Sequence, residues 1–337
     1  MVVRGFGNVG NTCGLNAVLQ CIAHTPVLRE YFLNAEAGKT AEGAKYSIAD
    51  ELKRLLHEFW TNDKSLVPTR FVRAFEEASR GRLRMGEQLD ITEVWLVLVD
   101  KLESEWQTTS KHVTAPWMNV QSRGVAPLVE RANAAWSQFM ARVPPSWASI
   151  VNGLQIGQVI CGSCAHVYHN FEPFTTLSLD IPAAEPGKSV HLSACFGTYF
   201  KQEELEGDWK CDKCEKTSAM KLTRFWGAPQ CLVVILKRFR YAPRLEKIHT
   251  PVDIPETFTL LEGTELSRMG TTDIPTYRIQ AIGCHFGTLG GGHYTSLARA
   301  PDGKWHHYDD LNITQLANSE QALKNNIHAY MLFYARD

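Results

Sequence analysis

The hydrophobic pattern of the sequence changes near residue 150, and this change constrains the fold more than any other feature. Before it, apolar residues recur at the spacing of amphipathic helices over residues 13–22, 48–59, 90–106 and 128–143. After it, runs rich in Val, Ile, Thr and aromatic residues alternate with turn residues, at 154–161, 174–181, 231–241, 276–286, 293–300, 304–310 and 328–335. A helical lobe followed by an antiparallel sheet predicts an α+β fold with a cleft between the two parts. Residues 108–124 show no clean period and are predicted to form a long connection or a partly ordered insertion.

Composition excludes several classes of protein. The chain has 337 residues, 44% of them hydrophobic, and a formal net charge of -1, so it lacks the global field that holds nucleic acid or anionic lipid. No run is long and apolar enough to span a bilayer, and the first eight residues lack the apolar core of a signal peptide. Nine cysteines, an odd number, fit a reducing compartment better than a disulfide framework. We expect a soluble, monomeric protein of the cytoplasm, with the nucleus as a second location.

Cys13 lies where the first helical pattern begins, in GNVGNTCGLNAVLQ. The positive end of a helix dipole favours a thiolate there, whereas burial on an apolar face disfavours it. A thiol nucleophile also needs a base, and the far end of the chain offers His293 behind three glycines in GGGHYTS. KWHHYDD then supplies Asp309 and Asp310, one of which can accept the imidazole N–H and hold the ring. The pattern predicts a cysteine protease in which two distant segments meet.

Each of these residues also has a purely structural interpretation. Cys13 could be a packing residue, because free cysteine is among the most buried residue types. A glycine run can form a tight hairpin, and Asp-Asp is usually a turn. Asn8, just upstream of Cys13, can donate a hydrogen bond to the oxyanion of a tetrahedral intermediate, but Asn in a Gly-rich loop is also a common turn residue. The combination favours catalysis more than any single residue does.

Four cysteines form two CxxC pairs, CGSC at Cys161 and Cys164 and CDKC at Cys211 and Cys214. Four thiolates complete a tetrahedral shell with no position open to water, which is the arrangement of structural zinc. The stretch between the pairs is longer than in a compact zinc ribbon, so we expect one zinc ion to clamp two hairpin tips together. Two alternatives remain open, namely reduced cysteines without metal and competing ligation by nearby histidines, His166 and His169. The other cysteines in apolar runs are predicted to be packing residues: Cys21, Cys195, Cys231 and Cys284.

These segments resemble the ubiquitin-specific protease family, the papain-like deubiquitinases with thumb, palm and fingers subdomains. GNVGNTCGLNAVLQCIAHTP is similar to the family's cysteine box, and GGGHYTS with WHHYDD is similar to its histidine box. GEQLDITEV resembles its QQD-x-x-E-F helix, FEPFTTLSLDIP and LVVILKRFRY its sheet strands, and AYMLFY its closing strand. The resemblance implies one catalytic domain over 1–337, with a helical thumb over about 1–149 and fingers and palm over 150–337. Zinc-bearing fingers are expected around 155–225.

The resemblance also implies a role for individual residues. Cys13 matches the nucleophile, His293 the base, Asp309 the third triad member and Asn8 the oxyanion donor, while Asp310 matches an acid that sometimes shares the triad's work. The two CxxC pairs match the zinc site of the fingers. Residues matching the substrate-tail channel are Gln88, Asp90, Glu93, Phe239, Tyr241 and Tyr294. The tail of ubiquitin carries two arginines before Gly-Gly, with which carboxylates form charge-assisted pairs. For the two aromatic residues of the LKRFRY strand, a core position is an equal alternative.

The activity implied is that of a cysteine isopeptidase, which hydrolyses the bond after the terminal Gly-Gly of ubiquitin on proteins or polyubiquitin chains. Two departures from the family pattern bear on rate and substrate preference: Gly14 replaces a large residue after Cys13, and Gln88-Leu89-Asp90 replaces QQD. Three alternatives remain: an enzyme for another ubiquitin-like modifier, a catalytically weak ubiquitin-binding scaffold, and a zinc-ribbon protein that binds nucleic acid. The last needs a basic face, which the near-neutral charge disfavours.

Overall fold

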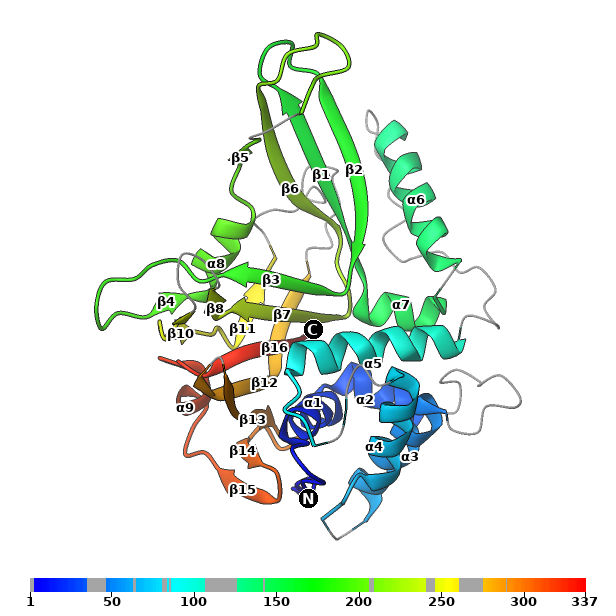
Figure 1. Cartoon of the computed structure of the whole chain (residues 1–337), viewed down its shortest axis with the longest axis vertical. Coiled ribbons are helices and arrows are strands. Elements are labelled where there is room, and N and C mark those ends of the chain that lie inside the picture. The colour runs from blue at the N-terminus through cyan, green and yellow to red at the C-terminus, as the bar shows by residue number, and fades with distance from the viewer. Residues whose placement is uncertain are drawn as a thin grey trace.

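The computed structural model describes residues 3–34, 47–62, 65–80, 84, 86–106, 126–141, 143–205, 209–240, 246–260, 275–288 and 290–337. Residues 108–124, predicted to be a connection or insertion, and Tyr241 lie outside this described part of the chain. Figure 1 shows a group of helices, a central sheet and a narrower sheet that projects from it. The predicted α+β class is confirmed.

The helices of the first half follow the predicted apolar patterns at four places and add others. The amphipathic pattern around Leu52 and Leu55, for example, becomes a helix with its apolar face buried. Three helices that the sequence pattern did not indicate, α2, α4 and α7, complete the group. The bounds are α1 Cys13–His24, α2 Pro26–Leu33, α3 Ile48–Thr61, α4 Thr69–Ser79, α5 Ile91–Trp106, α6 Ala126–Met140 and α7 Pro145–Val151.

The central sheet has eight strands, in the order β15-β14-β13-β12-β16-β7-β3 with β11 beside β12. All neighbours are antiparallel except β3 and β7, which run parallel, so the expectation of an antiparallel sheet is wrong at this edge. The long excursion between those two strands supplies the crossover that a parallel pair needs. The bounds are β3 Thr176–Asp180, β7 Cys231–Lys237, β11 Thr257–Thr259, β12 Thr276–Thr288, β13 Gly291–Arg299, β14 Trp305–Asp309, β15 Asn312–Gln315 and β16 Ala329–Arg336.

Both faces of the central sheet are covered, which explains the unbroken apolar run of β7. Cys231, Val233 and Ile235 belong to a core shared with helices α1 to α7. The alternate residues of the same strand, such as Leu232 and Val234, belong to a second core that includes residues of helix α8, Leu192–Tyr199. On the first face, α1 packs against β12 and β13. This packing brings the start of α1 close to the strand that carries His293.

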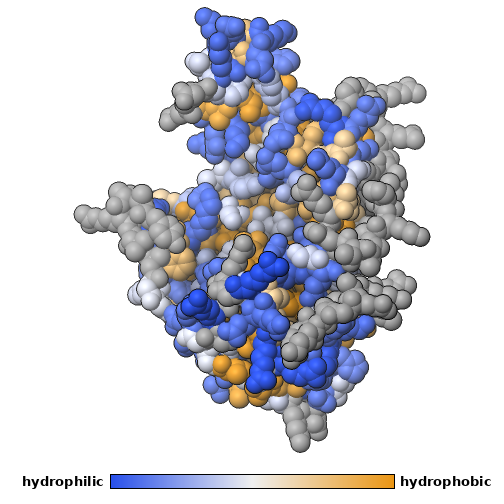
Figure 2. Space-filling model, turned by 45° about the vertical axis from the view of Figure 1, so that its right-hand side comes forward, coloured by the Kyte–Doolittle hydropathy of each residue, from blue (hydrophilic) through white to orange (hydrophobic). Residues whose placement is uncertain are grey.

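The projecting sheet has the strand order β2-β1-β6-β5 and carries the two CxxC turns at its far end (Figure 1). Its tip is mostly hydrophilic on the face seen in Figure 2. The remaining elements are two short ribbons, β4 with β10 and β8 with β9, and one short helix. The bounds are β1 Gly153–Cys161, β2 Val167–Phe174, β5 Glu203–Glu204, β6 Ala219–Gly227, β4 Val190–His191, β10 Val252–Asp253, β8 Phe239–Arg240, β9 Glu246–Lys247 and α9 Glu320–Leu323. Of the helices described, none is both long and apolar enough to cross a bilayer.

Candidate active site

Cys13 is the first residue of α1 and is only 5% exposed. The chain reaches it through a sharp turn, in which Gly10 and Asn11 adopt positive φ values of 90° and 54°. The side-chain oxygen of Asn8 holds this turn, because it accepts hydrogen bonds from the backbone N–H groups of Gly10 and Thr12, each at 3.1 Å. The loop therefore fixes both the start of the helix and the place of the thiol.

Burial decides the acidity of the Cys13 thiol. Desolvation raises its pKa above the ordinary value, and a hydrogen bond from the backbone N–H of Tyr294 acts in the opposite direction. The negative charge of Asp310 adds to the rise. The net pKa is raised, so burial outweighs the effect of the helix terminus, and the thiol needs a base to become a nucleophile at neutral pH.

His293 and Asp309 form the predicted imidazole–carboxylate pair. Nε2 of His293, on β13, lies 2.6 Å from Oδ1 of Asp309, the last residue of β14. Because this carboxylate fixes Nε2 as the protonated nitrogen, Nδ1 is left as the base. Among the described residues, Cys13 Sγ and His293 do not form a hydrogen bond; the sulfur instead meets the backbone of Tyr294, the next residue. The two distant segments thus come together as predicted, because Tyr294 directly follows His293 on β13.

Asp310 does not pair with His293 but with two asparagine amides. Its Oδ2 accepts a hydrogen bond from Nδ2 of Asn8 at 2.9 Å, and its Oδ1 accepts one from Nδ2 of Asn16 at 2.7 Å. Asn16, one turn after Cys13 on α1, was missed by sequence reasoning, although a polar residue at a buried position of an otherwise apolar helix is a usable signal. One N–H of the Asn8 amide remains available, so Asp310 and Asn16 can hold the predicted oxyanion donor in place.

His24 forms a second connection between α1 and β14. Its Nδ1 lies 2.9 Å from the carbonyl oxygen of Gln20, which can only accept, so Nδ1 carries the proton. Nε2 therefore accepts a hydrogen bond from the Tyr308 hydroxyl at 2.9 Å. Burial lowers the pKa of His24 to about 4, which keeps this neutral form at physiological pH. Because Tyr308 directly precedes Asp309, this hydrogen bond connects α1, which begins at Cys13, to the strand that carries Asp309.

Beside this cluster lies a cavity of about 710 Å³. It is lined by helix α5 and the segment before it, by the β12–β13 hairpin, and by single residues of β8 and β16. The structure brings together there five of the six residues predicted to line a substrate channel: Gln88, Asp90, Glu93, Phe239 and Tyr294. The sixth, Tyr241, is outside the described residues. Sequence reasoning missed His285 and Tyr330, whose places in the lining depend on strand pairing.

The two predicted carboxylates of this cavity are in different situations. Asp90 caps α5, because its Oδ1 accepts a hydrogen bond from Thr92 N–H at 2.8 Å. Its Oδ2 accepts the hydroxyl of Tyr294 at 2.8 Å, and burial together with this carboxylate raises the pKa of the phenol. Glu93 is exposed at the cavity. The side chain of Glu93 is therefore better placed than Asp90 to meet a cationic ligand.

The four cysteines of the CxxC pairs meet at the tip of the projecting sheet. Cys161 and Cys214 have their sulfurs 3.5 Å apart, Cys164 and Cys211 3.7 Å apart, and all four lie within 4.8 Å of one another. A tetrahedral site with Zn–S bonds of about 2.3 Å needs sulfur separations of about 3.8 Å, so the donor set fits zinc. Neither predicted competing histidine belongs to this cluster of described residues.

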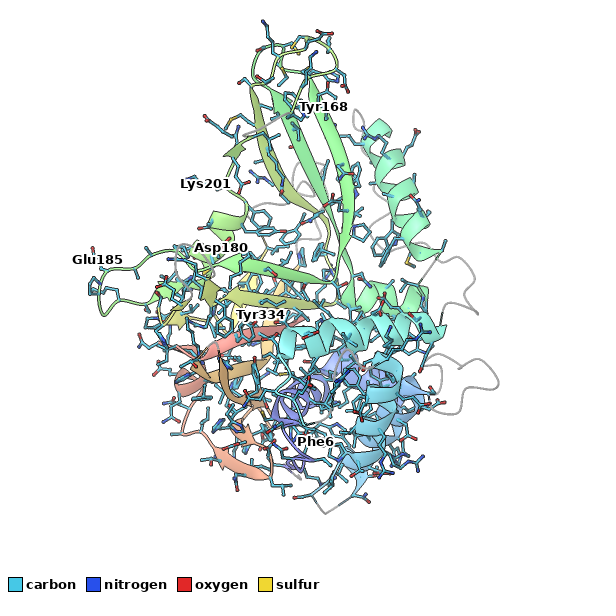
Figure 3. All side chains as sticks on the ribbon, in the orientation of Figure 1. Phe6, Tyr168, Asp180, Glu185, Lys201 and Tyr334 are labelled. Carbon is cyan, nitrogen blue, oxygen red and sulfur yellow. The ribbon has the colours of Figure 1, made fainter. Side chains whose placement is uncertain are left out.

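Tyr168, labelled in Figure 3 near that tip, lies on β2 and contacts the second CxxC turn. Its hydroxyl oxygen accepts a hydrogen bond from Asp212 N–H at 2.7 Å and lies 3.4 Å from Cys211 Sγ. The hydroxyl proton is therefore directed at the sulfur, in the manner of a group that supports a metal ligand. The other predicted packing cysteines are buried, as expected: Cys21, Cys195, Cys231 and Cys284.

The structure explains why a glycine, Gly14, follows Cys13 where the family pattern has a large residue. A Cβ atom at this position would lie 2.4 Å from the carbonyl oxygen of Leu89 and 3.5 Å from the Tyr294 ring. The backbone of the segment before α5 therefore packs directly on the first turn of α1, which a larger residue would prevent. Gly14 therefore packs against the backbone of the segment that carries the other departure, residues 88–90.

We expect Gly14→Ala to lower the free energy of unfolding by about 1–3 kcal/mol, because the new methyl group cannot be accommodated without moving backbone. Gly197→Ala is the matched control, since this glycine also lies in a helix but its Cβ would meet nothing within 4 Å. That substitution should raise stability by about 0.5–1 kcal/mol through helix propensity. Urea unfolding measures both. Equal or greater stability of Gly14→Ala relative to wild type would contradict the packing argument.

Comparison with known proteins agrees with this geometry. The sequence profile of the family described as Ubiquitin carboxyl-terminal hydrolase matches residues 4–334. Ubiquitin carboxyl-terminal hydrolase Usp2 of Drosophila melanogaster is 30% identical over 344 residues, which cover 98% of this chain and 34% of that protein. Human ubiquitin carboxyl-terminal hydrolase 21 is 30% identical over 353 residues, covering 98% and 61%. The chain thus spans between a third and two thirds of the length of these relatives.

Solved structures show the same fold. The SAGA Ubp8/Sgf11/Sus1/Sgf73 DUB module bound to ubiquitin aldehyde aligns with a TM-score of 0.77 at 21% identity, covering 99% of this chain and 70% of the other. A yeast SAGA DUBm structure with a mutant Sgf73 aligns with a TM-score of 0.76 at 22% identity, covering 99% and 68%. Together with the profile match over nearly every residue, these findings establish that the chain belongs to the ubiquitin carboxyl-terminal hydrolase family.

Proposed function

We propose that this domain is a cysteine isopeptidase that hydrolyses the bond after the C-terminal Gly-Gly of ubiquitin. The observation that carries the proposal is the meeting of Cys13 at the start of α1 with the strand of the His293–Asp309 pair, beside a glycine-lined cavity. The names of the relatives and a neighbouring structure bound to ubiquitin aldehyde support the same substrate. Another modifier that ends in Gly-Gly is the second candidate substrate, because the cavity would bind the C-terminal tail of the modifier and not its folded body.

The residues present can perform the reaction in two stages. His293 Nδ1 takes the proton of the Cys13 thiol, and the sulfur attacks the terminal glycine carbonyl to form a tetrahedral intermediate. The free N–H of Asn8 donates to the oxyanion, and the lysine amine leaves with the proton from His293. Water, deprotonated by His293, then hydrolyses the thioester and releases the carboxylate. The raised pKa of Cys13 means that the thiol needs His293 as a base to become a nucleophile.

We further propose that Asp309 and Asp310 have separate tasks. Asp309 holds the tautomer and orientation of His293 through its 2.6 Å contact. Asp310 is a positioning residue, because its carboxylate contacts the amides of Asn8 and Asn16. The two adjacent acids therefore act on different groups: Asp309 orients the base, His293, and Asp310 orients the oxyanion donor, Asn8.

A structural zinc ion at the cysteine cluster is part of the proposal. Cys161, Cys164, Cys211 and Cys214 would hold it, and it would supply cross-linking and no catalysis, since four thiolates leave no open position. The support is the spacing of the four sulfurs, which lie within 4.8 Å of one another at a tip that is mostly hydrophilic on the face seen in Figure 2.

Labelling with ubiquitin that carries a C-terminal electrophile tests the activity. We expect covalent labelling of wild type, none of Cys13→Ala, and normal labelling of Cys21→Ala, which removes the other cysteine of α1 from the core. Hydrolysis of a ubiquitin–aminocoumarin conjugate should follow the same order, because both reactions need the thiolate. Tight binding of ubiquitin without labelling would identify a silent scaffold, and labelling only by another Gly-Gly modifier would reassign the substrate.

A double-mutant cycle distinguishes the proposed roles of Asp309 and Asp310. Asn8→Ala and Asp310→Ala should each lower kcat by about 10²-fold, because both remove the oriented oxyanion donor. In an Asn8→Ala background, adding Asp310→Ala should cost less than about threefold more, since the donor it positions is already gone. Asp309→Ala should retain its full effect in that background. Additive losses for Asn8 and Asp310 would contradict the positioning role.

Zinc content tests the cysteine cluster. Purified wild type should contain about one zinc per chain by elemental analysis, and Cys164→Ser should lose it and unfold at a lower temperature, because metal binding contributes to folding free energy. Cys195→Ala, at a buried cysteine away from the cluster, should keep the metal. Full zinc content in Cys164→Ser, or none in wild type, would refute the site.

A further inference from the structure

The side chain of Gln88 forms an unusual contact across the cavity. Its Nε2 donates to the carbonyl oxygen of Gly292 at 2.7 Å, and its Oε1 accepts the N–H of Gly292 at 2.9 Å. Residues in an antiparallel strand pair exchange the same two bonds, so the primary amide takes the place of a strand residue beside β13. Gly292 immediately precedes His293, which places this contact next to the reacting atoms.

The edge of β13 at Gly292 is open to such a partner. On one side β12 pairs with β13 and sets Gly287 opposite Gly292, but the N–H of Gly292 points to Gln88 instead. On the other side β14 pairs with β13 only from Ser296 to Arg299. The main chain at Gly292 is thus a short free strand edge, which in this structure is covered by the Gln88 amide.

The main chain of β13 is bare at this edge, and at Gly292 it has no room for a side chain of its own. A Cβ at Gly292 would lie 2.2 Å from the Phe286 carbonyl oxygen and 2.3 Å from His285 Nε2, and one at Gly291 would lie 3.2 Å from Oε1 of Gln88. An extended tail of two glycines has no side chains and carries the N–H and C=O groups that a strand edge binds. The amide of Gln88 and the last peptide groups of such a tail therefore suit the same position.

We propose that Gln88 covers the edge of β13 at Gly292 in the free enzyme and is displaced by the main chain of the Gly-Gly tail. This inference rests on the proposed function and goes beyond it. A tail must replace both hydrogen bonds of the Gln88 amide, and the peptide groups of a Gly-Gly tail carry the N–H and C=O groups that can do so.

The exchange requires only a side-chain rotation. Gln88 is exposed, whereas the segment that carries it is held separately by Asp90, which caps α5 and binds the Tyr294 hydroxyl. Leu89 is buried against Gly14 and does not move with the amide. The Gln88 side chain can therefore leave Gly292 while the cavity wall keeps its form.

The test compares wild type with Gln88→Met, which keeps the length of the side chain but loses both hydrogen bonds. Gln315→Met is the control, since Gln315 is an exposed glutamine on β15, outside the cavity lining. With a ubiquitin–aminocoumarin conjugate, we expect KM to fall about fivefold in Gln88→Met with kcat within about twofold, because apparent affinity follows the fraction of molecules with an open site. The control should match wild type. An unchanged or raised KM in Gln88→Met overturns the proposal.

A second measurement needs no substrate. Hydrogen exchange at the Gly292 amide, followed by NMR, should be at least about tenfold faster in Gln88→Met than in wild type or Gln315→Met, because Oε1 of Gln88 no longer protects it. Equal exchange rates show that Gln88 does not cover the edge and also overturn the proposal. If wild type does not hydrolyse the ubiquitin conjugate, the proposed function fails, and the exchange rates still decide whether Gln88 covers the edge.

Discussion

The packing of α1 against β12 and β13 is the interaction on which the rest of the site depends. It places Cys13, from the start of the chain, beside Tyr294 and so beside His293, from the other end. A second close contact, with the segment before α5, requires Gly14, because the backbone at Leu89 occupies the space that any side chain would fill. Together the two contacts fix the places of Cys13 and His293 and of one wall of the cavity. The same packing buries the thiol, which raises its pKa.

Hydrogen bonds between α1 and β14 reinforce that packing at two levels. Near the thiol, Asp310 joins Asn8 and Asn16; near the far end of the helix, His24 accepts the Tyr308 hydroxyl. The two partners, Tyr308 and Asp310, flank Asp309 at the end of β14. The positions of Asn8 and of Asp309 are consequently set by the same short segment, so a shift in one would carry the other with it.

Sequence patterns were sufficient where the information is local. The helices around Leu52 and Val94, the α+β class, the His293–Asp309 pair and the cysteine cluster could all be predicted from spacing, burial pattern or motif. Helices α2 and α7 were missed because they are short, whereas α4, with 11 residues, has an amphipathic pattern that was overlooked. The parallel pairing of β3 with β7 depends on which strand is adjacent after a long excursion, and no local pattern records that. Asn16 was overlooked because its polar partner lies at the opposite end of the chain.

The absence of side chains has two distinct functions near this cavity. At Gly14 it lets two backbone segments of the protein touch, and at Gly292 it keeps β13 clear of the Phe286 carbonyl oxygen and the His285 ring on β12. In both places glycine is required because a Cβ atom would stand at the point of contact. The amide of Gln88 adds the polar groups of a peptide on a thin, unbranched stem, and through them it binds the main chain of Gly292 as a residue of a neighbouring strand would.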